Sequence, residues 1–264
     1  MAQALKDVYN RAYLEHLAQA FVAVHPAFPA DAFVHNVLDK HWPERELKAR
    51  TQHIRHCLHQ SLALPYEKAT AVLMEVAPGF SGYEAMFFPD FVDAYGRQHW
   101  EASMEALQVL TRYSSSEFAV RPFIEQDQPR MMAQMLSWSE HENYHVRRLA
   151  SEGCRPRLPW ASALPLFKQN PAPILPILNN LRCDETDYVR RSVANNLNDI
   201  AKDNPQITLD WAKRYGGSHK HSDWIIKHGC RTLLKQAHPG VMAFFGYHPA
   251  AEVEVKGLAM VTKK

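Results

Sequence analysis

The chain has 264 residues, of which 46% are hydrophobic and 22% charged, with a formal net charge of +2. This is ordinary globular composition, and the length suffices for one large domain or two small ones. No window approaches the roughly 20 apolar residues of a membrane span, and the first residues lack the basic and then apolar pattern of a secretion signal. We therefore expect a soluble, cytoplasmic protein. The four cysteines are far apart, which excludes a CxxC metal ribbon and gives no sign of a disulfide framework; they are Cys57, Cys154, Cys183 and Cys230.

Charge is distributed unevenly along the chain. Residues 1–135 hold 12 Lys and Arg against 16 Asp and Glu, whereas residues 136–264 hold 18 against 12. A basic half suits a polyanionic partner such as nucleic acid, because binding releases condensed counterions. The surplus is modest, so charge alone leaves the nature of the partner open.

The first 110 residues predict a series of short helices. Apolar residues recur at helical spacing, as in the stripe Leu14, Leu17, Ala18, Phe21 and Val22. Ten glycines are few for a β-protein of this size, and most of the 17 prolines fall between the predicted helices. Because period-2 alternation is nearly absent, the sequence favours the all-α class.

An internal repeat occupies the second half. The sequence NYHVRRLA at residues 143–150 resembles DYVRRSV at residues 187–193, and a fainter copy, DWIIK, lies at residues 223–227. A spacing near 40 residues is typical of HEAT repeats. The sequence predicts an α-solenoid of HEAT-like repeats over residues 1–246. Residues 247–264 form a tail in which residues 252–261 alternate like a strand.

The helical phase of the repeats predicts a buried stripe and a polar flank. The stripe contains Val146, Leu149, Ala150 and Gly153 in one helix, and Val189, Val193, Leu197 and Ile200 in the next. The flank contains Arg148 and Glu152 in the first helix and Arg191, Asn195 and Asp199 in the second. Such a flank could be a DNA-facing groove that contains acids. The alternative is that Arg148 and Glu152, four residues apart, form a solvated ion pair.

The segment after the first repeat helix carries further candidates. Gly153 can end the helix, and two prolines are expected to hold the following residues extended. Arg155 and Arg157 should then project near the end of the Glu152 helix, followed by Trp160. Arginine suits phosphate, and an indole can pack against sugar or base. The alternative is that Trp160 is a core anchor and the arginines are solvated.

Four stretches resemble a known family. They are SSEFAVRPFI (115–124), HVRRLASEGCRPRLPW (145–160), DYVRRSVANNLNDIAKDNP (187–205) and WIIKHGCRTLLK (224–235). Together they resemble the AlkC branch of the DNA alkylation repair family, over roughly residues 110–245. That family comprises HEAT-like-repeat DNA glycosylases that remove alkylated bases such as 3-methyladenine and, in the AlkC branch, also 3-methylcytosine.

The resemblance implies that Glu117, Glu152 and Asp199 are the catalytic acids. Glu152 and Asp199 also lie on the flank that the helical phase predicts, whereas Glu117 rests on the resemblance alone and could simply favour a helix start. An N3-alkylated purine is already cationic, so the enzyme mainly needs negative charge beside the oxocarbenium ion and a positioned water. One of Glu152 and Asp199 could stabilise the sugar while the other orients water.

The implied partner is double-stranded DNA containing alkylated bases. We expect the protein to act as a monomer and to bind no membrane. The residues expected to contact DNA are Arg148, Arg155, Arg157, Trp160, Arg191 and Asn195. Longer family members continue into an immunoglobulin-like domain that helps grip DNA. The tail of this chain could be a remnant of that domain or an extra strand on the solenoid. We expect its affinity for DNA to be weaker than that of the longer members. The alternative function is a noncatalytic HEAT-repeat module that binds DNA or a protein.

Three other patterns in the sequence could carry a function. HENYH at residues 141–145 matches the zinc motif H-E-x-x-H, but its place at the turn entering the repeat helix separates the two histidines. A helically spaced cluster lacks a second liganding element and is predicted to be packed or exposed; it contains His53, His56, Cys57 and His59. Core packing is predicted for Trp138, Trp211, Trp224, Met131, Met132 and Met135. Because no P-loop or GxGxxG occurs either, we expect no cofactor and no metal.

Overall fold

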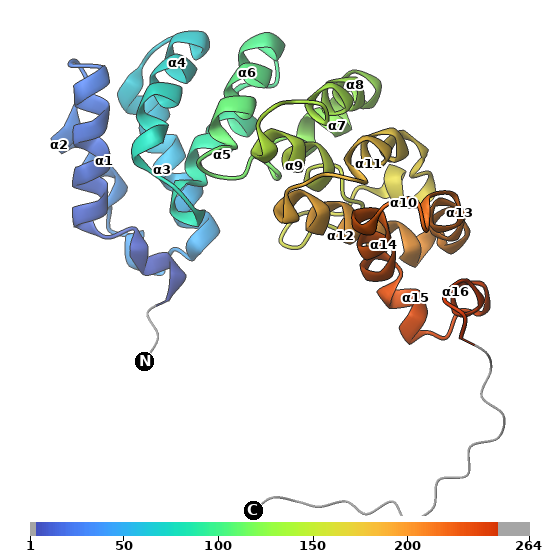
Figure 1. Cartoon of the computed structure of the whole chain (residues 1–264). Coiled ribbons are helices and arrows are strands. Elements are labelled where there is room, and N and C mark those ends of the chain that lie inside the picture. Colours follow the sequence, from blue (N-terminus) through green and yellow to red (C-terminus); the bar gives the residue numbers. More distant parts are fainter. Residues whose placement is uncertain (1–3, 248–264) are drawn as a thin grey trace, which may run out of the picture.

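The computed structural model describes residues 4–247, and these residues form α-helices and short 3-10 helices without any strand (Figure 1). The α-helices are α1 (Arg11–Val24), α2 (Ala30–Val37), α3 (Leu47–Leu62), α4 (Tyr66–Val76), α5 (Phe87–Tyr95), α6 (Trp100–Leu110), α7 (Arg121–Gln126), α8 (Gln128–Trp138), α9 (Tyr144–Glu152), α10 (Pro165–Gln169), α11 (Leu175–Leu181), α12 (Asp187–Asp203), α13 (Pro205–Tyr215), α14 (Lys220–Gly229), α15 (Arg231–Lys235) and α16 (Pro239–Phe244). The 3-10 helices are Leu5–Val8, Trp42–Glu44, Ala77–Gly79, Tyr83–Ala85 and Ala172–Ile174. The all-α prediction is confirmed, and the predicted strand-like stretch at residues 252–261 lies outside the described residues.

Short polar side chains and prolines begin many of these helices. The side chain of Asn10 accepts a hydrogen bond from Tyr13 N at the start of α1, and Asn143 does the same for His145 N at the start of α9. These bonds satisfy backbone donors that have no partner within the helix. Proline occupies the first turn of α7, α8, α13 and α16, where its missing N–H is not needed.

The helices stack in pairs along an arc from α1 at one end to α16 at the other (Figure 1). In the second half, α8 packs on α9, α11 on α12 and α13 on α14. The later member of each pair forms a row, because α12 contacts both α9 and α14. These are the three helices that carry the sequence repeat, so the predicted α-solenoid is confirmed.

The stripe predicted from the helical phase forms the core between these rows. Val146, Leu149 and Ala150 of α9 are fully buried, as are Val189 and Val193 of α12. Burying one such aliphatic side chain contributes about 1.5–3 kcal/mol. The stripe therefore fixes the rotation of α9 and α12 and, with it, the direction in which their polar flanks point.

The predicted tryptophan and methionine core is right except at one position. Buried members are Trp138, Trp211, Met131, Met132 and Met135. Trp224 is instead 39% exposed and stacks on the His228 ring with centroids 5.2 Å apart. The reason is that Ile225 and Ile226 fill the core-facing side of α14.

None of the described helices has both the length and the apolar character needed to cross a membrane.

Candidate active site

The three predicted acids come from different elements. Glu152 is the last residue of α9, Asp199 lies in the second half of α12, and Glu117 lies in the turn before α7. The helix ends where predicted, with Gly153 as its C-cap. A Cβ atom at Gly153 would lie 2.4 Å from Val120 Cγ2. Glycine therefore lets the end of α9 approach the segment that carries Glu117.

Two arginines join these acids into one network. Arg155 Nη1 lies 2.6 Å from Glu152 Oε1, and Arg155 Nε lies 2.8 Å from Asp199 Oδ2. Arg148 pairs with Glu117 through Nη1, and its Nη2 lies 3.3 Å from Glu152 Oε1. Glu152 is thus the central acid, because it contacts both arginines.

Further donors contact the carboxylates of this network. We call the network the acid cluster and define it as Glu117, Arg148, Glu152, Arg155 and Asp199. Ser192 Oγ donates to Glu152 Oε2 at 2.6 Å, and Ser115 Oγ donates to Glu117 Oε2 at 2.7 Å. Lys202 Nζ lies 3.1 Å from Asp199 Oδ1. Hydrogen bonds to a charged carboxylate are stronger than neutral ones, so these donors hold the acids in fixed orientations.

The acid cluster also keeps its arginines charged. Burial lowers the pKa of Arg148, but the charges of Glu152 and Glu117 outweigh burial and raise the pKa above its ordinary value. The pKa of Arg155 is raised in the same way, with Glu152 and Asp199 outweighing its burial. A carboxylate at this distance favours the ionised form of a guanidinium. The two arginines are therefore fixed positive charges in the site.

The cluster reaches the surface at one side. The side chain of Glu117 is 15% exposed and that of Arg148 is 12% exposed, whereas those of Glu152 and Asp199 are 6% and 2% exposed. The guanidinium of Arg148 lies over the Tyr188 ring, 4.8 Å from its centroid. Within the acid cluster, Glu117 and Arg148 are therefore the most accessible side chains and Asp199 is the least accessible.

The expectation that the arginines project into the groove needs correction at two positions. Arg155 folds back between Glu152 and Asp199 and is 7% exposed, and Arg148 is likewise committed to the acids. The Arg148–Glu152 pair exists as predicted, but it is buried, so the solvated alternative is wrong. The helical phase gives the direction of a side chain and not the partners that its length can reach.

The other predicted arginines lie at the surface, and each pairs with an aspartate. Arg157 makes two hydrogen bonds to Asp203, at 2.9 and 2.6 Å. Arg191 pairs with Asp187 at 2.6 Å, and its side chain is 67% exposed. Asn195 Oδ1 accepts a hydrogen bond from Arg231 Nη2 at 3.0 Å.

Trp160 lies at the surface rather than in the core. Its side chain is 63% exposed and its φ is +67°, which excludes the core-anchor alternative. Residues 154–160 form turns and not the predicted extended segment. The loop folds this way because Arg121 Nη1 donates to the carbonyls of Gly153 and Arg155, at 3.1 and 2.9 Å.

A hollow of about 370 Å³ borders the acid cluster at Ser115. Phe118 and Trp160 form part of its wall, together with Lys48 of α3. Lys48 Nζ donates to the Trp160 carbonyl, so a helix of the acidic half helps to place this indole. Sequence reasoning did not predict this hollow.

Sequence reasoning also missed the residues that orient the acids. Ser192 occupies the position in α12 that Leu149 occupies in α9, three residues after the equivalent valine. A small polar residue in an apolar stripe is a signal that could have identified it. Lys202 could have been found from its helical spacing, because it lies three residues after Asp199 in α12. Arg121 gave no comparable signal, because its partners are backbone carbonyls.

Neither of the two histidine patterns gathers three metal-ligand atoms within the described part of the chain. His141 precedes α9, and its Nδ1 accepts a hydrogen bond from Asn143 N at 2.9 Å, so it does not share a helical face with His145, as predicted. His53 bonds to Asn36 O, and His59 stacks on Tyr95. Within residues 4–247, metal-ligand atoms gather instead at Glu185, His219 and His221, outside the acid cluster.

Comparisons with known proteins agree with this architecture. The profile of a family described as DNA alkylation repair enzyme matches residues 111–233. The chain is 46% identical over 260 residues to the protein YhaZ of Bacillus subtilis (strain 168), covering 98% of this chain and 73% of YhaZ. It also superposes with a TM-score of 0.89 and 38% identity on the alkylpurine DNA glycosylase AlkC of Pseudomonas fluorescens, bound to DNA containing an abasic site analog; the match covers 93% of this chain and 69% of AlkC. The chain therefore belongs to the DNA alkylation repair family, in the branch of AlkC.

Proposed function

We propose that this protein is a DNA glycosylase that hydrolyses the N-glycosidic bond of cationic alkylated bases, with 3-methyladenine and 3-methylcytosine as its substrates. The observation that carries the proposal is the acid cluster, in which Glu117, Glu152 and Asp199 are joined through two arginines. The similarity to an alkylpurine glycosylase supports it, and an abasic site is what base excision leaves in DNA.

The chemistry follows from where charge develops. When the bond breaks, the cationic base leaves as a neutral molecule and the positive charge moves to the sugar. Fixed carboxylates beside the sugar stabilise this oxocarbenium ion. Water then adds to the anomeric carbon and loses a proton to a carboxylate or to solvent. We assign these tasks to Glu117, Glu152 and Asp199, with Glu152 at the centre.

The arginines divide into two groups in this proposal. Arg148 and Arg155 orient the side chains of the acids, and they would contact DNA only where the acid cluster is exposed. Arg157 and Arg191 are more exposed and can exchange their aspartate partners for phosphate. Trp160 can pack against the sugar-phosphate backbone or a base of double-stranded DNA, and Asn195 can donate to a phosphate.

The test is release of free base from methylated duplex DNA under single-turnover conditions in EDTA. The full chain should release 3-methyladenine and 3-methylcytosine. Glu117→Gln, Glu152→Gln and Asp199→Asn should each slow release, while the exposed Glu75→Gln of α4 should not. No release by the wild-type chain would overturn the proposal.

The low exposure of Glu152 and Asp199 favours one other function, a noncatalytic module that binds DNA or a protein, in which the charges serve only to hold repeats together. The same assay separates the two. Tight DNA binding with no base release, and with unchanged binding in Glu152→Gln, would support the noncatalytic module.

A further inference from the structure

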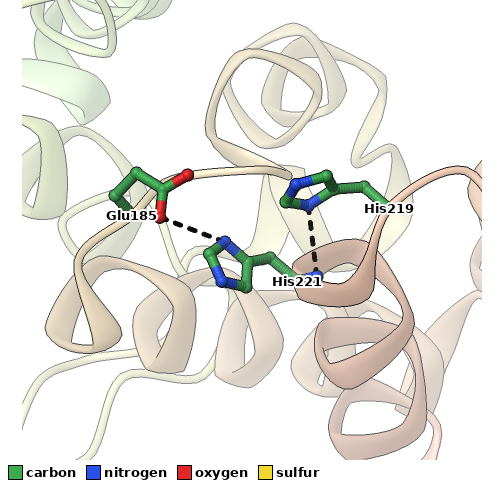
Figure 2. Close-up of side chains that lie close together, drawn as sticks. All are labelled: Glu185, His219 and His221. Atoms are coloured by element: carbon green, nitrogen blue, oxygen red, sulfur yellow. Dashed lines mark hydrogen bonds and ion pairs between the residues drawn. The ribbon is translucent and has the colours of Figure 1, made fainter.

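A second group of polar side chains lies where α12 and α14 begin (Figure 2). Glu185 belongs to the turn before α12, His219 is the N-cap of α14, and His221 lies in the first turn of α14. One ligand atom of each lies within 4.8 Å of the others, and Glu185 Oε2 is 3.9 Å from His221 Nδ1. We call this group the junction cluster.

The packing of α12 against α14 positions the backbone that carries these residues, whereas the Glu185 side chain itself is 83% exposed. Asp184, next to Glu185, pairs with Arg147 of α9 at 2.6 Å, which fixes the turn on one side. On the other side, Ser222 Oγ donates to Arg182 O at 3.2 Å. The side chain of His221 is only 14% exposed, with Nδ1 3.4 Å from Cys183 O. His221 therefore has little rotamer freedom to lose when it binds a ligand.

We propose that Glu185, His219 and His221 bind one divalent transition cation, Zn²⁺ being the cation that this ligand set suits best. Two imidazole nitrogens and one carboxylate oxygen form a ligand set that zinc accepts, whereas calcium and magnesium require mostly oxygen ligands. Three protein ligands leave a position for water. This differs from the sequence expectation that no metal is bound, because the three residues come together only in the fold.

Binding exchanges two existing hydrogen bonds, one of which is the bond of His221 Nδ1 to Cys183 O when that nitrogen coordinates. His219 Nδ1 accepts from His221 N at 3.2 Å, and a neutral imidazole has one lone-pair nitrogen, so coordination through either nitrogen replaces this bond. The positive end of α14 and the neighbouring Lys220 also oppose a cation. We therefore expect weaker binding than in a closed four-ligand zinc site. The gain is a direct link between the turn before α12 and the start of α14.

A bound cation should stabilise the stack of repeats and leave base excision unchanged. Because an ion that binds only the folded chain shifts the folding equilibrium by mass action, the Tm of the chain should rise with zinc concentration. None of the three residues contacts the acid cluster. The metal is thus a link between helices and has no role in the reaction.

The experiment uses the full chain after removal of metal with EDTA and exhaustive dialysis. Titration with ZnCl₂ in a calorimeter should give one ion per chain, and MgCl₂ should give no comparable heat. His219→Asn combined with His221→Gln should weaken zinc binding at least tenfold and abolish the zinc-dependent rise in Tm. Asparagine at position 219 keeps the N-cap, so loss of folding does not explain this result.

Two comparisons complete the test. His35→Gln combined with His56→Gln removes two exposed histidines and should leave zinc affinity unchanged. Base release by the His219→Asn, His221→Gln variant should equal that of the wild type, so the zinc site and the proposed glycosylase activity can fail independently. Equal zinc affinity in this variant and the wild type, or no zinc binding at all, would overturn the proposal.

Discussion

Glu152 contacts three donors, and this determines what its substitution should do. Arg148, Arg155 and Ser192 all contact its carboxylate. Glu152→Gln should slow single-turnover base release roughly 100-fold or more, the effect of losing one transition-state electrostatic contact. DNA binding should persist or tighten, because a charge that repels phosphate is gone.

The same substitution should also destabilise the fold. Removing one partner of a buried ion pair costs about 3–5 kcal/mol, and a residual amide contact should keep the loss toward the lower end. Urea unfolding measures this loss of free energy. The base-release assay is run below the temperature at which the variant unfolds, so that only folded protein is compared. Base release at the wild-type rate would remove Glu152 from the mechanism.

Ser192 offers a second test at the scale of one hydroxyl. Its hydrogen bond to the Glu152 carboxylate is 2.6 Å long and buried. Ser192→Ala should lower the free energy of unfolding by about 1.5–3 kcal/mol, the contribution of a hydrogen bond to a charged group. Base release should slow, but less than in Glu152→Gln, because the carboxylate remains.

Ser151→Ala is the matched control for Ser192→Ala. Ser151 is also buried, but its Oγ has no hydrogen-bond partner among residues 4–247. Its removal should not lower the free energy of unfolding by a comparable amount, because a buried hydroxyl without a partner is itself unfavourable. Equal effects of the two substitutions would mean that the hydroxyl of Ser192 does not position Glu152.

At the scale of helices, the sequence predicts how a helix is rotated about its axis better than it predicts which side chains touch. The valines of the repeat fix the phase of α9 and α12, and from this phase Glu152 and Asp199 are placed on neighbouring flanks. The phase cannot show that Arg155, beyond the end of α9, reaches back to both acids. Nor can it place Trp160, whose loop is held by Arg121 from α7. Periodicity describes a helix, whereas these contacts depend on turns and on long side chains.

The close approach of α12 and α14 gives a prediction at this scale. A Cβ atom at Gly229 would lie 2.7 Å from Leu197 Cδ2 and 3.1 Å from Leu197 Cβ and Cγ. Leu197 cannot give way by moving its tip alone, so Gly229→Ala should overpack the junction and cost about 1–3 kcal/mol. Urea unfolding checks this value. Gly79→Ala is the control, because no atom lies within 4 Å of its added Cβ.

For the whole molecule, the histidines whose pKa is lowered in the folded chain predict the direction of pH dependence. Burial lowers the pKa of four of them, His53, His59, His145 and His228. Because an unfolded histidine has a pKa of about 6.5, the unfolded chain binds more protons than the folded chain below that pH. The free energy of unfolding should therefore fall as the pH decreases through 6.5 and below.

Urea unfolding at pH 7.5, 6.5 and 5.5 measures this dependence. His228→Gln should make it shallower, because burial and the charges of Arg231 and Arg191 lower the pKa of His228. His16→Gln replaces an exposed histidine of α1 and is the comparison variant. Stability that stays constant or rises on acidification would contradict the prediction.

The charge asymmetry of the chain predicts where DNA binds, and the salt dependence of binding tests it. Arg191 is 67% exposed and forms an i, i+4 pair with Asp187. If it contacts a phosphate, Arg191→Ala should weaken binding to damaged and undamaged duplex alike and reduce the slope of log K against log salt by about 0.9. Arg157→Ala should have a similar effect. Catalysis within the bound complex should change less.

Arg11 of α1 is a closely matched control for Arg191. It is 66% exposed and also forms an i, i+4 pair, with Glu15, but it lies in the acidic half of the chain. Arg11→Ala should therefore leave the salt slope unchanged. Arg155→Ala should instead lower stability and base release, because it leaves Glu152 and Asp199 without their shared partner. Equal slopes for Arg191→Ala and Arg11→Ala would mean that DNA does not lie along the flank of α9 and α12. The acid cluster would then not face the phosphodiester backbone of bound DNA.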